Sequence, residues 1–478
     1  MNSRSKKILL LLLAAALLTA NGFLLPVLNR ERGALGITRL EPLENAPPVL
    51  ALTTQVLGGF RGLIANALWI RSTQLQEDGK YFEMVQLADW ITKLEPHITT
   101  VWTVQAWNMA FNISVKFPDH ADRWRWVQRG IELLRDDAIR YNPDQPMLYG
   151  DLAWMFQFKM GQNMDDANLY YKDAWAYEMM QVLQGVGGRF DGLINPQTPL
   201  QQEQARVLRT KYKMDPLKMR ELNERYGPLD WRLPEAHAIY WASVGLDKAR
   251  KDEDVRKLRT AIYQSMNLSF QRGRLLLSSN APPRMLPNLE IIPKVDAAFQ
   301  EQITNSPPHL TNGISKAYKN FLRDVPYQYY IVNRTRDAEL WLRTLRQKFP
   351  ESLPADVTLA EYAVIRAEMQ TVDQRQAYIT GLMQAFVVNS FRAELDDQRE
   401  DAQEYMRRAQ ELYAAYNQRT KGNIRIAIPT VGELQNFVAD QMLAPDSGLG
   451  PEEMARLRTR LGRPAPSPTP TPGPLKPQ

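Results

Sequence analysis

Two stretches of the sequence, PHITTVWTVQAWNM (96–109) and PDQPMLYGDLAWMF (143–156), have the same layout. Each begins with a proline, and a large aromatic residue stands six positions later: Trp102 after Pro96 and Tyr149 after Pro143. From there the apolar residues continue at steps of three and four, the spacing of one face of an α-helix. A helix with a single apolar face must bury that face against a neighbour, so these stretches predict packed helices.

The same periodicity extends well beyond these two stretches. One set of apolar residues runs from Val127 to Tyr141 and another from Tyr405 to Tyr416, both at steps of three and four. Strict alternation of apolar and polar residues, the sign of a half-buried strand, is hard to find over any length. The chain is therefore expected to be all-α.

The pattern over about residues 80–180 resembles the tetratricopeptide repeat. In that family a proline ends the second helix of a pair, and a large residue opens the next helix. A small residue, here Ala106 or Ala153, lets the helices approach closely. The two prolines lie 47 residues apart instead of the family's roughly 34, and the extra length falls in 114–122. The whole chain also looks like tetratricopeptide-type proteins of bacterial envelopes. This resemblance implies a solenoid of helical hairpins and implies no catalytic activity.

The N-terminus predicts a membrane segment. Arg4, Lys6 and Lys7 precede residues 8–28, which carry no charge. At 1.5 Å per residue this stretch spans about 30 Å, the thickness of a bilayer core. The basic flank should stay in the cytoplasm, so we expect a single-pass anchor in the bacterial inner membrane and a periplasmic main domain. Cleavage after Ala20 is the alternative, and it would release a soluble secreted protein.

Composition gives the rest of the organisation. Residues 184–232 interrupt the periodicity with Gly and Pro, whereas residues 278–312 are so rich in proline that we expect a loop with at most short helices. Gly245 is expected to end the helix that begins near Glu235. The predicted regions are a membrane anchor (1–29), a linker (30–47), tetratricopeptide-like repeats (48–183), an insertion (184–232), a second, repeat-like helical region (233–445), and a short helix with a proline-rich tail (446–478).

Several classes of function are disfavoured. The chain has no cysteine, which excludes disulfides and zinc–thiolate sites. Its 59 basic and 53 acidic residues leave a net charge of only +6, unlike the basic face of a nucleic-acid binder. No phosphate-binding or nucleophile motif is present. The four histidines have no metal-ligand spacing, so we expect no catalytic residues, no metal and no cofactor.

The expected function is a scaffold that binds another envelope protein. The tryptophans at 102, 107, 124, 126, 154 and 175 should mostly be packed between helices. Arg123, Trp124, Arg125 and Trp126 are the candidate partner-binding patch, because a helix cannot bury all four. The alternative is an envelope enzyme or glycan-binding protein. Its pocket would lie where the insertion meets the repeats, near Asp230, Glu235 and His237.

Overall fold

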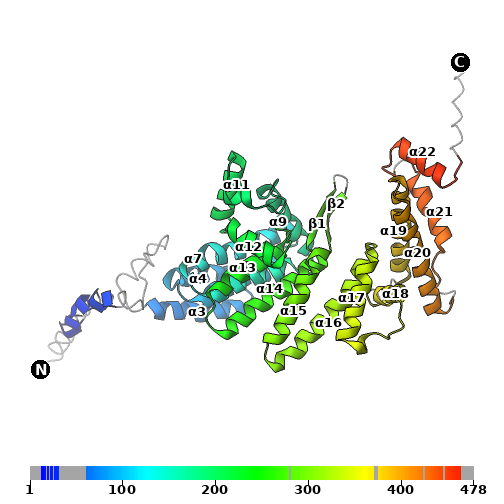
Figure 1. The fold of residues 1–478 in the computed structure, drawn as a ribbon. Helices are drawn as coiled ribbons and strands as arrows, with labels where there is room; N and C mark the ends of the chain where they lie inside the picture. The colour runs from blue at the N-terminus through cyan, green and yellow to red at the C-terminus, as the bar shows by residue number, and fades with distance from the viewer. Residues whose placement is uncertain are drawn as a thin grey trace, which may run out of the picture. The chain divides into compact units, whose positions relative to one another are not determined.

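The computed structural model describes residues 61–278, 281–370, 375–423, 426–444 and 447–464, with parts of 12–31. These residues are mostly α-helical, which confirms the all-α prediction (Figure 1). The chain divides into two compact units, an N-terminal unit (1–151) and a C-terminal unit (152–478). The predicted membrane segment at 8–28 is described only in part, and the tail beyond 464 lies outside the described residues. Among the helices described, none combines the length and apolar character needed to cross a bilayer.

The N-terminal unit is built from consecutive helices that pack on one another. The pairs α3–α4 and α4–α5 are in contact, and α6 packs on the helix that precedes it. π-Helical turns at Asn108–Ile113 and Leu133–Ala138 extend α5 and α6. The boundary between the two units falls within the last of these helices. The helices are α3 (Arg61–Glu77), α4 (Tyr81–Leu94), α5 (Thr99–Trp107), α6 (His120–Glu132), α7 (Ile139–Tyr141) and α8 (Pro146–Trp154).

Both proline turns are held by the aromatic residue six positions later. The indole Nε1 of Trp102 donates a hydrogen bond to the carbonyl oxygen of Pro96 (2.8 Å). In the same way the hydroxyl of Tyr149 donates to the carbonyl oxygen of Pro143 (2.8 Å). The side chain of Asn142, at the end of this helix pair, also donates to the Pro96 oxygen (2.8 Å), so it ties the end of the pair to the turn where the same pair begins. The large aromatic residue therefore fixes the turn as well as filling the groove.

The expected small residue at 106 lies at a close helix crossing. Ala106 is fully buried, and Gly130 of α6 faces its backbone. A Cβ atom built on Gly130 would stand 2.8 Å from the carbonyl oxygen of Ala106, which is closer than carbon and oxygen can normally approach. The two helices can therefore be this close only because residue 130 has no side chain.

The C-terminal unit continues the series of helices. The pairs α13–α14, α16–α17 and α19–α20 lie side by side (Figure 1). Its elements are α9 (Asn168–Val182), α10 (Asp191–Ile194), α11 (Pro199–Thr210), α12 (Pro216–Tyr226), α13 (Pro234–Lys248), α14 (Asp252–Arg272), β1 (Arg274–Ser278), β2 (Ala281–Leu286), α15 (Ile292–Asn305), α16 (Pro308–Ile331), α17 (Thr335–Lys348), α18 (Leu359–Gln370), α19 (Arg375–Leu395), α20 (Arg399–Thr420), α21 (Val431–Met442) and α22 (Pro451–Arg460).

Two helices of the insertion begin after residues that cap them. Thr198 accepts a hydrogen bond from the Gln201 amide (3.2 Å) at the start of α11, and Asp215 accepts one from the Leu217 amide (3.3 Å) at the start of α12. Both helices have proline at their first position, where no hydrogen-bond donor is needed.

The prediction of a loop at 278–312 is wrong. This region contains an antiparallel hairpin, β1–β2, followed by the full-length helix α15 and the start of α16. Two of the prolines occupy positions where no backbone hydrogen bond is lost: Pro293 and Pro308 lie in the first turn of α15 and α16. The strand β2 carries Pro282 and Pro283 where its register with β1 shifts.

One helix boundary was also misplaced. The helix α13 runs through Gly245 to Lys248, so Gly245 is an interior residue and not a cap.

Replacement of Gly130 by Ala tests the close helix crossing. In an exposed helix interior this change would stabilise the protein by up to about 1 kcal/mol. Here we expect a loss of about 1–3 kcal/mol, because the new methyl group collides with the Ala106 backbone. Thermal unfolding followed by circular dichroism measures the difference.

The matched control is Gly62→Ala in α3, because a Cβ atom there meets nothing within 4 Å. It should leave the unfolding temperature unchanged or raise it. Equal behaviour of the two variants would contradict the close crossing.

Candidate binding site

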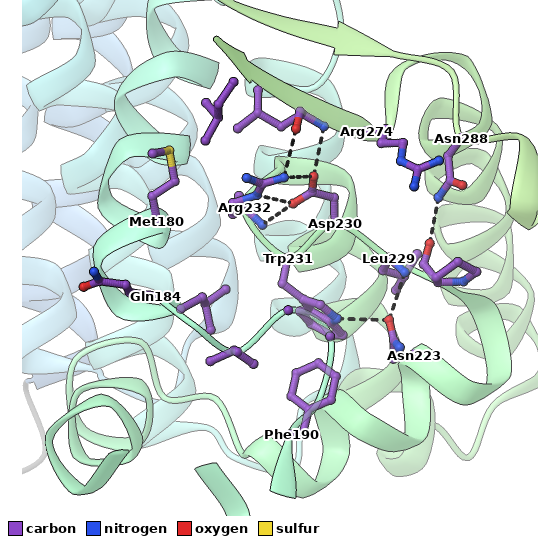
Figure 2. A pocket seen from close by; sticks show the side chains of 18 of the residues that line it. Met180, Gln184, Phe190, Asn223, Leu229, Asp230, Trp231, Arg232, Arg274 and Asn288 are labelled. Carbon is purple, nitrogen blue, oxygen red and sulfur yellow. Dashed lines mark hydrogen bonds and ion pairs between the residues drawn. The ribbon is translucent and has the colours of Figure 1, made fainter. Parts of the chain in front are cut away.

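A cavity of about 630 Å³ lies in the C-terminal unit, between the end of α9, the turn before α13 and strand β1 (Figure 2). The insertion at 184–232 supplies two of its walls. The alternative hypothesis placed a pocket at this junction, but of the three residues that it named, only Asp230 lines the cavity.

The turn at 227–233 forms the floor of the cavity and is fixed from three other elements. Asn223 of α12 accepts hydrogen bonds at its Oδ1 from the Leu229 amide (2.9 Å) and the Trp231 indole (3.3 Å). The carbonyl oxygens of the turn are also occupied. Asn288 donates to the Pro228 oxygen (2.7 Å), and Nε2 of His237 donates to the Trp231 oxygen (2.9 Å). Buried backbone groups need such partners, so these side chains stabilise the turn.

An ion pair ties the same turn to strand β1. Arg232 donates to both carboxylate oxygens of Asp230, from Nε (2.8 Å) and Nη2 (2.6 Å). Asp230 also accepts from the Leu275 amide (2.9 Å), and Arg232 donates to the Leu275 carbonyl (3.0 Å). Figure 2 shows this closed set of contacts at the wall of the cavity. The Asp230 carboxylate is therefore fully engaged, which argues against a role in proton transfer.

The opposite wall is a glycine-rich segment that follows α9. Gly185, Gly187 and Gly188 have φ angles of +77°, +52° and +81°, which residues with a side chain rarely adopt. A Cβ atom at any of the three would meet nothing within 4 Å, so the space beside them is open. This segment leaves room for a ligand to approach the backbone closely.

The apolar part of the lining is mostly aliphatic. Met180 lines it from α9 and Leu183 from the position just after that helix, and Leu277, which is 43% exposed, lines it from β1. The two aromatic rings, Phe190 and Trp231, contact each other edge to face and are only 2% and 4% exposed. Their faces are therefore not available as a stacking platform.

Three side-chain amides at the cavity have a nitrogen or an oxygen that binds no other described residue. Asn223 uses its oxygen within the turn, and its nitrogen has no partner among the described residues. Asn288 is the reverse: its nitrogen is used and its oxygen is not. Gln184 lines the cavity with its whole carboxamide available within the described structure. The cavity thus offers donors and acceptors without a free charge.

The residues named by the alternative hypothesis do not share the cavity. Asp230 lines it, whereas Glu235 and His237 are each 1% exposed and are not part of the lining. The His237 ring is packed between Phe156 (5.3 Å) and Trp175 (4.9 Å), so it is a helix-packing residue.

Glu235 belongs to a separate buried ionic cluster. Arg272 donates to Glu235 (3.1 Å) and to Asn163 (3.0 Å). Lys172 donates to Asn163 (3.0 Å) and Asn168 (2.8 Å) and has no carboxylate partner among the described residues. Burial raises the pKa of Glu235, against the effect of Arg272. Burial, helped by Arg272, lowers the pKa of Lys172 to about 8.

The predicted patch at 123–126 does not form one surface. Arg123 and Trp124 are each 7% exposed. Arg125 is exposed and pairs with Asp122 (2.7 Å). The Trp126 ring is half-buried and lies against Phe82 (5.6 Å between ring centres), with Arg129 over it. Only Arg125 and Trp126 remain available to a partner, and that role stays a prediction.

Only half of the six tryptophans expected between helices are buried. Those at 102 and 175 are buried, as is the one at 124, whereas those at 126 and 154 are half-buried. Trp107 is 40% exposed and stacks on Phe111 (5.3 Å).

No family model, curated protein or solved structure matches the chain. Within the described residues, no three His, Asp or Glu side chains are grouped as metal ligands would be. The candidate site is therefore defined by its own geometry alone.

The lowered pKa of Lys172 gives a pH-dependent test of the buried cluster. Between about pH 8 and 10.5 the unfolded chain holds a proton on Lys172 that the folded chain has lost. This group therefore makes the free energy of unfolding rise with pH across that window, and contributes no slope below pH 8. Lys172→Met should flatten the profile by up to about 1.4 kcal/mol per pH unit.

Urea unfolding of both proteins between pH 7 and 10 measures this difference. The other titratable groups are the same in the two proteins, so the contribution of Lys172 is the difference between their free energies of unfolding at each pH. Parallel profiles would show that folding does not lower the pKa of Lys172.

Proposed function

We propose that the chain is a membrane-anchored, extracytoplasmic scaffold whose tetratricopeptide-like helix pairs bind another protein of the cell envelope. The observation that carries the proposal is the repeated turn. Trp102 binds the Pro96 carbonyl and Tyr149 binds the Pro143 carbonyl at the same distance, 47 residues apart. A π-helical turn follows each aromatic residue, at Asn108–Ile113 and Met155–Met160, again at the same offset.

Equal contacts at an equal offset are what a structural repeat produces. Repeat domains bury a continuous core between neighbouring pairs and leave extended faces uncovered, which serve as binding surfaces. The offset exceeds that of the usual tetratricopeptide repeat because the two helices are long, at 99–116 and 120–141. The turn between them is short, so the extra length does not form a long turn at 114–122 as the sequence suggested.

The attachment to the membrane rests on the N-terminal sequence. Residues 8–28 are long enough to span the bilayer, and the basic residues before them favour an N-in orientation. With the N-terminus inside, the helical units and the cavity would face the periplasm, where the partner is another envelope protein.

An envelope enzyme or glycan-binding protein is the second candidate, favoured by the position of the cavity. Two observations weaken it. The Asp230 carboxylate is held by Arg232 and the Leu275 amide, and the aromatic faces of Phe190 and Trp231 are covered. Catalysis needs a group free to exchange a proton, and sugar stacking needs an open ring. Binding of a protein segment needs neither.

Partner capture tests the scaffold function. The full chain, tagged at its C-terminus and cross-linked in intact cells, should bring one envelope protein with it from membranes in mild detergent. Recovery of the tagged chain alone as a monomer would contradict the proposed function.

The remaining exposed part of the predicted patch is tested in the same assay. Arg125→Ala with Trp126→Ala should lower capture about tenfold if these residues lie at the centre of the interface, where few residues dominate affinity. The control is Phe437→Ala, which removes an exposed aromatic ring from α21. Helicity is checked by circular dichroism. Unchanged capture by the double variant would remove the patch from the interface.

A further inference from the structure

We propose that the cavity beside β1 binds an extended, uncharged polypeptide segment with aliphatic side chains. This inference rests on the scaffold function and names the kind of partner segment. The argument comes from four properties of the cavity: its charge balance, its carboxamides, its strand edge and its glycine-rich wall.

The charged groups of the lining are already neutralised. Arg232 pairs with Asp230 (2.6 Å), and Arg274 pairs with Glu290 (3.2 Å). Each positive side chain thus has a negative partner within the lining. A charged ligand would leave its own charge uncompensated in a partly apolar cavity, which is unfavourable. An anionic lipid headgroup, a nucleotide or a basic peptide therefore fits poorly, whereas an uncharged segment fits.

The available polar groups match a peptide backbone. A peptide unit has one N–H donor and one C=O acceptor. The cavity offers a donor from Asn223, an acceptor from Asn288 and both from Gln184. In Figure 2, Gln184 lies across the cavity from Asn223 and Asn288. An extended chain passing between them can satisfy its main chain on both sides.

Strand β1 adds a backbone edge to the same wall. Its other edge pairs with β2, in a register that places Leu276 opposite Arg284. The Leu275 amide and carbonyl point away from β2, because they bind Asp230 and Arg232. Because these two groups are already occupied, a bound segment in extended form can pair with this edge only at Leu277, where the register of β1 with β2 shifts. Pairing with a strand edge is a recurrent way of binding peptides.

The side-chain environment selects aliphatic residues. Leu277 and Met180 form an apolar wall, and the glycines at 185, 187 and 188 let a backbone come close without a steric clash. Because the rings of Phe190 and Trp231 are covered, a sugar finds no stacking surface.

The experiment measures binding of defined probes to the full-length protein in detergent micelles. The main probe is a fluorescein-labelled, amide-capped peptide of uncharged residues, GSVQLSVQG, followed by fluorescence anisotropy. Its backbone N-methylated form keeps the side chains but loses the amide donors. A chito-oligosaccharide and a lysophospholipid are offered as competitors. We expect the first peptide to bind, and the N-methylated form to bind at least about tenfold more weakly, since each main-chain hydrogen bond that it loses leaves a polar group of the cavity without a partner.

Two matched variants locate the binding. Leu277→Asp places a charge on the cavity wall, whereas Leu276→Asp places the same charge on the other face of the same strand. Both residues are similarly exposed, at 43% and 50%, so the fold should tolerate both changes. We expect Leu277→Asp to weaken peptide binding about tenfold or more, and Leu276→Asp to leave it within a factor of about two.

Each outcome decides the inference. It is overturned by equal effects of the two variants, by displacement of the peptide with the oligosaccharide or the lipid, by equal affinity of the N-methylated peptide, or by no binding at all. Failure here is distinguishable from failure of the scaffold function. If Leu277→Asp still captures the envelope partner as well as the unchanged chain does, the scaffold stands and its partner binds elsewhere.

Discussion

The backbone carbonyl groups of the turns need hydrogen-bond partners, and the packing of the helices depends on meeting that need. Helices with one apolar face are stable only when packed together, which brings the turns between them against neighbouring side chains. A carbonyl that loses water there without gaining another partner is unfavourable. Side-chain donors solve the problem in both units. Trp102 and Tyr149 bind the carbonyls of Pro96 and Pro143, and Asn288 binds that of Pro228.

The same solution shapes the candidate site. The turn at 227–233 is held by partners from α12, α13 and the segment after β2, so it cannot collapse into the space beside it. The pair of Asp230 and Arg232 then fixes β1 against the turn. A rigid floor and a rigid strand leave a cavity whose polar groups are set in advance. Such preorganisation favours binding, because little order has to be gained when the ligand arrives.

Much of the helical architecture could be predicted from the sequence, because apolar spacing reports directly on a helix face. Ala106 lies at a close helix crossing, but the crossing depends on Gly130, which the sequence did not single out. The hydrogen bonds by which Trp102 and Tyr149 hold the proline turns were likewise not evident from spacing. The region at 278–312 was misread because proline counts against helix only in the interior, and Pro293 and Pro308 occupy first turns. Arg123 and Trp124 were judged exposed because the sequence did not reveal which face of α6 is buried.

Of the candidate site, the sequence predicted only the approximate location and not the residues that line it. Its place followed from the junction of the 184–232 insertion with the helices, but its lining did not. The sequence spacing of the key lining residues does not mark them as members of a site. Turns and a hairpin bring them together, and helical periodicity does not predict either; the residues are Asn223, Asn288, Gln184 and Leu277. The glycines at 185, 187 and 188 belong to a stretch that the sequence marks only as an interruption of the helical periodicity, without a sign that they line a cavity.

The central claim is that these helices are presented outside the cytoplasmic membrane. The chain has no cysteine, so a single one introduced at an exposed position can be labelled without background. Arg125→Cys in the N-terminal unit and Leu340→Cys in the C-terminal unit suit this purpose. In cells with a permeabilised outer membrane, a membrane-impermeant maleimide should label both as fully as after lysis. Labelling that appears only after the cytoplasmic membrane is broken would contradict the claim.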